Sequence, residues 1–554
     1  MVQRSIAEPN GIKPPMGWSS DWAIECNAPR DETIYGQADR IDKNGLKTAG
    51  YTTIIFDCGW ERGYNSDGSP QTLTDREILE LNKRFIHKQT EKASFPNGIG
   101  NFVGWIKPKG FNFGVGTWGG PQLCSRPFGG GPEAGLDIPW DLEAYVKSLA
   151  DQGVVYLMHR PCDMPSTEFL QNPDTATKLD ERYINMQNAL LNTRVSMFYA
   201  TGQWGASALA QQKLANSWRV SDEQLPIWDS FVRSLNGVVA FAHYARPGAF
   251  NDLGFLRLAR TDDGELNFVE KRTMFTFWAA TKSPLIFSDK VQDVDKDTVE
   301  MIKNPNAIKV NQDELGKSVT LRRRYPNEKD IWSGPLKDGG TVVFVVNWAQ
   351  GDQRTTIKLD DLGFSAARVE DLWVGQDLGI KEKSFEIDIA HRGSLLLKLT
   401  ETKEAPRKEF TRFTIDQAEV VAPAEIKMVG DQKVARYIGP EGKGSVVWKD
   451  IPGGGTDEVT IALDYIHAAL PENNEDTGNL SFKRVLITVN DDANLQFQVH
   501  LPRTGMTWSD IYNGFLASIK LPNKSNTVRI SGLDQWAPEF VALSIVKTPA
   551  TPAT

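Results

Sequence analysis

Short apolar runs alternate with longer amphipathic stretches from Pro14 to about Asn311. The runs that predict buried strands are TTIIFD (52–57), FNFGVG (111–116), VVYLM (154–158), VSMFYA (195–200) and SPLIFS (283–288). Between them, 35–49 and 141–151 carry apolar residues at helical spacing. This alternation predicts a parallel sheet covered by helices, and its length fits a (β/α)8 barrel over residues 1–312.

The pattern changes after Gln312, where short apolar runs follow one another without long helices. The runs 339–348, 355–359 and 394–400 predict an antiparallel β-sandwich over residues 313–402. A charged, proline-containing linker (400–409) precedes a second series of strand-like runs between 445 and 533. We therefore expect an α/β chain in which the (β/α)8 barrel is followed by two all-β sandwich domains, the second spanning 410–548.

The stretch GVVYLMHRPC (153–162) reads as one buried strand that ends in His159, Arg160 and Cys162. Active sites of β/α barrels lie at the carboxyl ends of the strands, so these residues are candidates for a site. The alternative is a strand that simply emerges into solvent. Because neighbouring strand residues point to opposite faces, His159 faces the helices if Arg160 faces the lumen.

Composition narrows the class of partner. The 554 residues carry a formal net charge of -9 without a Lys/Arg block, which argues against nucleic acid. No apolar run is long enough to span a membrane, and no zinc-type His/Cys spacing or phosphate-binding Gly loop is present, so we expect no metal and no cofactor. The 16 Trp and 26 Phe favour a carbohydrate partner, because aromatic rings near a cleft stack on sugars, although most will be core.

Four cysteines, Cys26, Cys58, Cys124 and Cys162, lie in the first third of the chain. An even number in one subregion fits two disulfides and an oxidising compartment, with three pairings open. We therefore expect a secreted, extracellular protein.

Several motifs occur in a consistent order over residues 10–400: PPMGWSSDW (14–22), YTTIIFDCGW (51–60), KGFNFGVGTWGGPQLC (109–124), GVVYLMHRPC (153–162), TGQWG (201–205), NSWR (216–219) and RPGAFND (246–252). Together they resemble glycoside hydrolase family 27, the α-galactosidase family, which implies a (β/α)8 barrel followed by a β-sandwich. Residues 410–547 resemble a carbohydrate-binding module of family 35 or 6. The resemblance also implies the pairings Cys26 with Cys58 and Cys124 with Cys162.

The chain departs from the family at the catalytic strand. Where the family has its nucleophilic Asp, two residues before a cysteine, this sequence has Arg160, and Met158 replaces a Lys. Asp57 is kept on the second strand, whereas Gly116 stands for a Tyr and Trp118 for an Asp on the third. The resemblance therefore implies that the barrel is retained and that the galactose site is altered.

The resemblance also implies a position for the general acid. Arg219 matches the family's Trp-Arg, and the family's spacing from it leads to Glu223, with Asp222 one residue earlier. A carboxylic acid at this place suits a proton donor. Glu223 and Asp222 are thus the catalytic candidates, and the alternative is a pair of solvated loop acids.

Arg160 has three readings. A guanidinium about 4 Å from the anomeric centre would cost on the order of 4 kcal/mol in the transition state at an effective dielectric of 20. Either catalysis has been lost, or Arg160 holds an anionic group such as a carboxylate, or it pairs with Asp163 or Asp57 and fills the old site. Substrate-binding candidates, each with a packing alternative, are Asp57, Trp18, Trp22, Trp118, His159, Arg160, Gln203, Trp204, Arg219 and Asp252.

The leading hypothesis is a secreted, exo-acting glycoside hydrolase related to α-galactosidases, with an altered nucleophile position and an altered substrate or mechanism. Its partner would be an oligosaccharide or polysaccharide side chain, with an anionic sugar as one option. Glu223 would act as general acid, and Asp57, Asp163 and Asp252 are candidates for the second group. The alternatives are a non-catalytic carbohydrate-binding protein, and a standard retaining α-galactosidase if the fourth strand is misplaced.

Overall fold

The structure is a computed structural model. It describes residues 12–24, 31–57, 61–64, 70–72, 95, 98–118, 141–160, 173–202, 212–221, 223–262, 264–440, 443–455, 457–469, 482–505 and 507–547. The chain divides into two compact units, one formed by residues 1–234 and 241–318 and the other by residues 235–240 and 319–554.

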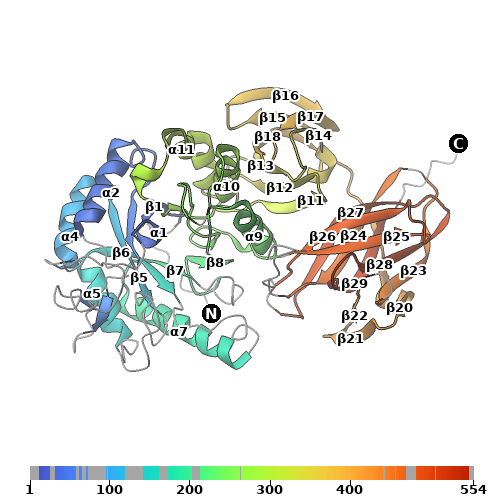
Figure 1. Cartoon of the computed structure of the whole chain (residues 1–554), viewed down its shortest axis with the longest axis horizontal. Coiled ribbons are helices and arrows are strands. Elements are labelled where there is room, and N and C mark those ends of the chain that lie inside the picture. The colour runs from blue at the N-terminus through green and yellow to red at the C-terminus, as the bar shows by residue number, and fades with distance from the viewer. Residues whose placement is uncertain are drawn as a thin grey trace. The chain divides into compact units, whose positions relative to one another are not determined.

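An eight-stranded parallel sheet forms the core of the first unit (Figure 1). Its strands, in sheet order, are β10 (Leu285–Phe287), β1 (Met16–Ser19), β2 (Thr53–Phe56), β5 (Asn112–Trp118), β6 (Val154–Arg160), β7 (Phe198–Thr201), β8 (Ser217–Arg219) and β9 (Phe250–Asp252). A parallel bridge between Leu256, just after β9, and Phe287 of β10 links the two edges. The sheet therefore closes in the manner of a (β/α)8 barrel, as the sequence predicts.

Helices connect the barrel strands. They are α1 (Asp21–Ile24), α2 (Asp31–Lys43), α4 (Ile99–Ile106), α5 (Leu142–Asp151), α7 (Pro173–Thr193), α9 (Trp228–Val238), α10 (Phe268–Ala280), α11 (Lys296–Ile302) and α12 (Pro305–Asn311), with 3-10 turns η1 (Lys107–Lys109), η2 (Ala242–Tyr244) and η3 (Val291–Asp293). A short hairpin, β3 (Glu61–Tyr64) with β4 (Pro70–Thr72), follows β2. Among the described residues, no helix combines the length and the apolar character needed to cross a membrane.

The sequence placed one helix too far along the chain. A helix was expected over 35–49, but α2 begins at Asp31 and ends at Lys43. Gly45 has a φ of 73°, a left-handed conformation that ends helices and that glycine adopts without strain. The expected helix over 141–151 is α5, whose N-cap Asp141 accepts a hydrogen bond from Ala144 N.

The lumen of the barrel is filled by side chains, as in other small barrels. Its core cluster consists of Ile55, Tyr156, Met158, Phe198, Ala200, Phe250, Phe255 and Ile286. Tyr156, Met158 and Arg160 alternate along β6, so they share one face of the strand. The apolar layer therefore ends where Arg160 begins the polar end of the barrel.

The second unit contains the two expected β-sandwich domains. The first has a six-stranded antiparallel sheet and a two-stranded sheet (β14–β17) around an apolar core that includes Val343, Val369 and Leu397. Its elements are β11 (Thr320–Tyr325), β12 (Lys329–Pro335), β13 (Thr341–Asn347), β14 (Gln353–Lys358), η4 (Leu359–Leu362), β15 (Phe364–Asp371), β16 (Gln376–Glu382), β17 (Ser384–Ile389) and β18 (Ser394–Glu404).

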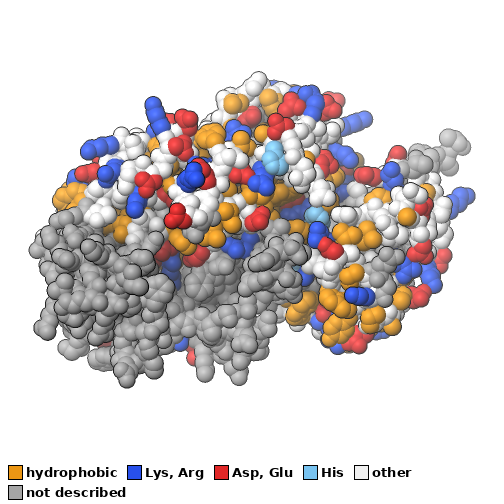
Figure 2. All heavy atoms as spheres, in the orientation of Figure 1, with side chains coloured by type: hydrophobic (Ala, Val, Ile, Leu, Met, Phe, Trp, Pro, Cys, Tyr) orange, Lys and Arg blue, Asp and Glu red, His pale blue; other side chains and the backbone are white. Residues whose placement is uncertain are grey.

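The C-terminal sandwich packs a six-stranded sheet on a five-stranded one, with Trp448, Tyr465 and Phe540 in its core. Its elements are β19 (Phe410–Thr414), η5 (Ile415–Gln417), β20 (Ala418–Val421), β21 (Glu425–Val429), β22 (Gln432–Arg436), β23 (Ser445–Pro452), β24 (Glu458–Ile466), β25 (Phe482–Val489), β26 (Gln496–Pro502), β27 (Ile511–Lys520), β28 (Ser525–Gly532) and β29 (Glu539–Val546). Hydrophobic side chains gather on its surface where Figure 1 places β21 and β22 (Figure 2).

Candidate active site

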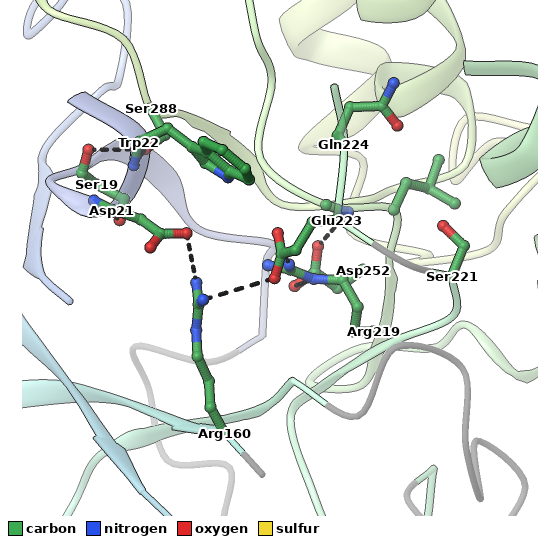
Figure 3. Close-up of polar contacts among 12 residues, drawn as sticks. Ser19, Asp21, Trp22, Arg160, Arg219, Ser221, Glu223, Gln224, Asp252 and Ser288 are labelled. Atoms are coloured by element: carbon green, nitrogen blue, oxygen red, sulfur yellow. Dashed lines mark hydrogen bonds and ion pairs between the residues drawn. The ribbon is translucent and has the colours of Figure 1, made fainter. Parts of the chain in front are cut away.

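Arg160, the last residue of β6, lies among three carboxylates (Figure 3). Its Nη2 donates to Asp21 Oδ2 at 2.8 Å and to Asp57 Oδ2 at 2.9 Å. Its Nη1 lies 3.5 Å from Glu223 Oε1. β6 is the fourth strand of the barrel along the chain, so Arg160 stands at the end of the strand where the sequence placed it.

A second arginine completes the cluster from the neighbouring strands. Arg219, at the end of β8, donates through Nη1 to Glu223 Oε2 at 2.7 Å and through Nε to Asp252 Oδ2 at 3.2 Å. Asp252 is the last residue of β9, and its Oδ1 also accepts from Gly254 N. Glu223 therefore bridges the two guanidinium groups.

Phe255 underlies both arginines. Its ring centroid is 4.8 Å from the guanidinium carbon of Arg219 and 5.6 Å from that of Arg160. Phe255 belongs to the lumen core, so the polar cluster rests directly on apolar packing. The negative face of the ring attracts both guanidinium groups, although their like charges repel each other.

Two serines and a glycine position the carboxylates that follow β1 and β2. Ser20 Oγ accepts from the backbone N–H of Asp57, and Ser19 Oγ lies 3.4 Å from Asp57 Oδ2. Ser19 Oγ also accepts from Asp21 N. A β-carbon built at Gly116 on β5 would overlap the side chain and the carbonyl of Asp57. The family's Tyr at this place therefore could not coexist with Asp57 in its present position.

Glu223 is held by a short hydrogen-bonded segment. Arg233 on α9 donates to the Glu223 carbonyl at 2.9 Å. Ser234 donates to Gln224 Oε1 and exchanges a hydrogen bond with Ser221. This segment fixes the backbone on both sides of Glu223, so the carboxylate is directed at the arginines rather than at solvent. The solvated-loop alternative for Glu223 therefore does not describe this structure, in which its side chain is 18% exposed.

The cluster holds more carboxylates than guanidinium groups. Burial raises the pKa of Asp57 from 3.8 to about 7, although Arg160 opposes the shift. Burial likewise raises the pKa of Asp21. Burial disfavours the charge of Arg160, but Asp21 and Asp57 outweigh it and hold its pKa well above the usual value. Asp57 therefore exchanges a proton near neutral pH, and both arginines stay charged.

Three predicted site residues lie elsewhere. Trp18 on β1 is fully buried and donates through Nε1 to the Asp289 carbonyl, so it is a core side chain, the packing alternative. His159 is 2% exposed and its Nδ1 lies 2.8 Å from Tyr199 Oη, away from the arginine cluster. Trp22 on α1 packs against the lumen core. The alternation of β6 explains His159, because Arg160 takes the lumen face.

Several predicted residues lie outside the described part of the chain. These are Asp222, Gln203, Trp204, Asp163 and the four cysteines Cys26, Cys58, Cys124 and Cys162. Trp118 is placed as the last residue of β5, but its side chain is not described. Among the described residues, no group of three or more His, Cys, Asp or Glu is arranged to hold a metal ion.

Sequence reasoning did not choose Asp21 as a site residue. The signal was present, because Asp21 lies two residues after the last residue of β1, at the carboxyl end of a barrel strand. Only the barrel brings it to Arg160, 139 positions later in the chain. The pairing of Arg160 with Asp57 is one of the three alternatives that the sequence left open.

Comparison with known proteins relates the barrel and the first β-sandwich to known families. The family model described as "Alpha galactosidase A" matches residues 13–313, and the one described as "Alpha galactosidase C-terminal beta sandwich domain" matches residues 326–399. "Probable alpha-galactosidase D" of Aspergillus fumigatus is 30% identical over 421 residues, which are 73% of this chain and 61% of that protein. "Alpha-galactosidase D" of Emericella nidulans is 28% identical, over 71% of this chain and 56% of its own. The chain thus spans about three fifths of the length of these relatives.

Solved structures agree on the fold. The crystal structure of alpha-galactosidase I from Mortierella vinacea covers 72% of this chain and 99% of its own, with 25% identity and a TM-score of 0.59. The Saccharomyces cerevisiae alpha-galactosidase solved with raffinose covers 70% and 98%, with 22% identity and a TM-score of 0.57. A family 27 β-L-arabinopyranosidase from Geobacillus stearothermophilus covers 70% and 96%, with 19% identity and a TM-score of 0.55.

Asp57→Asn tests the charge state of the cluster. Because the pKa of Asp57 is about 7 in the folded chain and 3.8 in the unfolded one, its contribution to stability is present below pH 4 and lost as the pH rises through 7. The substitution removes this loss. The unfolding free energy of the variant minus that of the wild type should therefore rise by up to about 4 kcal/mol between pH 4 and pH 8. Urea unfolding at several pH values measures the difference. Asp297→Asn, at an exposed aspartate, is the control, and parallel pH curves for wild type and Asp57→Asn would contradict the assignment.

Proposed function

Because this chain belongs to the α-galactosidase A family, we propose that it is an exo-acting glycoside hydrolase with an altered catalytic pair. The substrate would be a terminal sugar on an oligosaccharide or polysaccharide side chain. The observation that carries the proposal is the placement of Glu223 opposite Asp57 and Asp21, on the two sides of the Arg160 guanidinium.

Glycoside hydrolysis needs two carboxyl groups that flank the scissile bond. Glu223, steered by Arg219, would protonate the leaving oxygen. Asp57 would accept a proton from the attacking water, because a carboxyl group whose pKa is about 7 is partly ionised at neutral pH. A water that attacks from the face opposite to the leaving group inverts the anomeric configuration, unlike the retaining chemistry expected for the family.

Arg160 excludes the family's own nucleophilic step from this proposal. A guanidinium carries only donors and stays charged, so it cannot attack an anomeric carbon. Its charge would oppose an isolated oxocarbenium ion, but here Asp21, Asp57 and Glu223 surround it. The developing positive charge therefore meets a cluster in which carboxylates outnumber cations, and the penalty expected for a lone arginine is offset. A standard retaining α-galactosidase would need a carboxylate where β6 ends in Arg160.

A non-catalytic carbohydrate-binding protein is the second candidate. One observation favours it: Arg160 connects Glu223 to Asp21 and Asp57, and so occupies the space between the carboxylates that a sugar would have to enter. In that case the cluster would be a rigid floor for recognition rather than a catalytic pair.

Carbohydrate binding by the C-terminal sandwich is part of the same proposal. Its exposed aromatic side chains support it: Tyr437 is 54%, Trp508 44% and Trp536 50% exposed. Exposed rings of this size provide flat apolar faces for sugars at little entropic cost.

We also propose that the protein is secreted, which the four cysteines in one subregion of the chain support.

Glu223→Gln should lower turnover at least about a hundredfold, because a general acid contributes that much or more. Release of sugar from α- and β-linked galactosides, arabinosides and uronides measures it, and the anomer first formed distinguishes inversion from retention. Glu265→Gln is the matched control, the same substitution at an exposed glutamate of the same unit. No turnover on any substrate, with sugar binding intact, would replace the hydrolase by the second candidate.

Trp508→Ala and Tyr437→Ala should each weaken binding of the full chain to its polysaccharide about threefold to tenfold, the value of a lost ring contact. Affinity electrophoresis in polysaccharide gels measures the retention. Phe268→Ala removes an equally exposed ring from the barrel unit and should change nothing. Unchanged retention of both sandwich variants would argue against sugar binding at this surface.

Two disulfides predict that iodoacetamide adds nothing to the denatured, unreduced protein and four groups after reduction. Intact-mass spectrometry gives both counts. Four additions before reduction would contradict the oxidising compartment.

A further inference from the structure

A cavity of about 290 Å³ opens at the carboxyl ends of β1, β9 and β10. Its walls come from the segments that follow these strands, and they include Trp22, Arg257, Arg260, Asp289, Lys290 and Asp293. Trp22 is the next residue after Asp21, so the cavity adjoins the segment that contributes to the Arg160 cluster. Its volume is at the lower end of ligand sites and is suited to one sugar ring rather than to an extended chain.

Arg257 is the charged residue built into the wall. It is 3% exposed, and its guanidinium carbon lies 4.3 Å from the centroid of the Trp22 ring. Its Nε lies 3.4 Å from Asp289 Oδ1. Its Nη1 is buried and has no hydrogen-bond partner among the described residues. Burying a guanidinium nitrogen without an acceptor is costly, so an acceptor that a ligand supplies would stabilise it.

The walls supply hydrogen-bond donors in excess of acceptors. Trp22 Nε1 is likewise buried without an acceptor among the described residues. Neither an indole nor a guanidinium can accept a hydrogen bond. The Asp289 carboxylate accepts from Arg257 Nε through Oδ1 and from Leu258 N through Oδ2 at 2.6 Å, and it makes no hydrogen bond to Arg257 Nη1 or Trp22 Nε1. A ligand for this cavity must therefore bring its own acceptor oxygens.

Charge favours an acceptor that is anionic. Arg257, Arg260 and Lys290 line the cavity against Asp289 and Asp293, so the formal balance is positive. By contrast, Arg160 is already bonded to Asp21 and Asp57 and lies close to Glu223. Nη1 of Arg257 therefore remains available to an acceptor that a ligand brings into this cavity.

We propose that this cavity is a subsite for an acidic sugar, whose oxyanion binds Arg257 between the Trp22 ring and Lys290. The proposal names the substrate class of the proposed hydrolase and rests on that function for the identification of the ligand as a sugar. A uronic acid carboxylate and a sulfate ester share the required chemistry, an oxyanion on a sugar ring.

The test is binding of D-galacturonate, galactose 6-sulfate and galactose to the full wild-type chain, followed by isothermal titration calorimetry. None of the three has a glycosidic bond to cleave, so the result is independent of turnover. At least one acidic sugar should bind about tenfold or more tightly than galactose, and the tighter of the two identifies the oxyanion. Equal affinities for the three would overturn the proposal.

Arg257→Lys keeps the charge but loses the planar fork, and should weaken the acidic sugar about tenfold while galactose is unaffected. Arg194→Lys, at an exposed arginine of the same unit, is the matched control. Since Arg257 is buried and its variant can misfold, Lys290→Ala at the exposed rim is the second probe and should weaken the acid a few-fold. Acid binding that neither substitution changes would refute the site, whereas failure of hydrolysis alone would refute only the proposed activity.

Discussion

A buried guanidinium shared among carboxylates from separate strands is the interaction on which this barrel's polar end depends. Arg160 joins Asp21 after β1 and Asp57 after β2 to Glu223 after β8. Removing one partner from a buried pair leaves an uncompensated charge and typically costs about 3 to 5 kcal/mol. The cluster therefore constrains which residues its neighbours can be, and Gly116, whose missing side chain leaves room for Asp57, is one such consequence.

The same interaction is the basis of the proposed departure from the chemistry of the family. A carboxylate at the end of the fourth strand would serve as a nucleophile, whereas an arginine there serves as a counter-ion for the remaining acids. Burial shifts the pKa of Asp57 into the neutral range, which is the basis for its proposed role as proton acceptor.

Arg160 and Arg257 are both buried in the barrel unit, but the sequence pointed only to Arg160 as a site residue. Nη2 of Arg160 donates to Asp21 and Asp57, whereas Nη1 of Arg257 is buried without an acceptor among the described residues. Phe255 and Trp22 each carry a guanidinium on the face of the ring, so aromatic packing supports both cations at the end of the lumen. A guanidinium held in this way loses little side-chain freedom when it binds an anion.

The sequence by itself determined the order of the domains, the barrel strands from their apolar runs, and the opposed faces of Arg160 and His159, because period-two alternation is a local property of a strand. The resemblance to family 27 also identified Glu223 and Asp57 as candidates. It could not decide that Asp21 joins them, that Trp18 is core, or that Arg257 lines a cavity, since each depends on segments more than a hundred residues apart meeting at one barrel edge. These contacts depend on closure of the sheet, which brings together strands that are distant in the sequence.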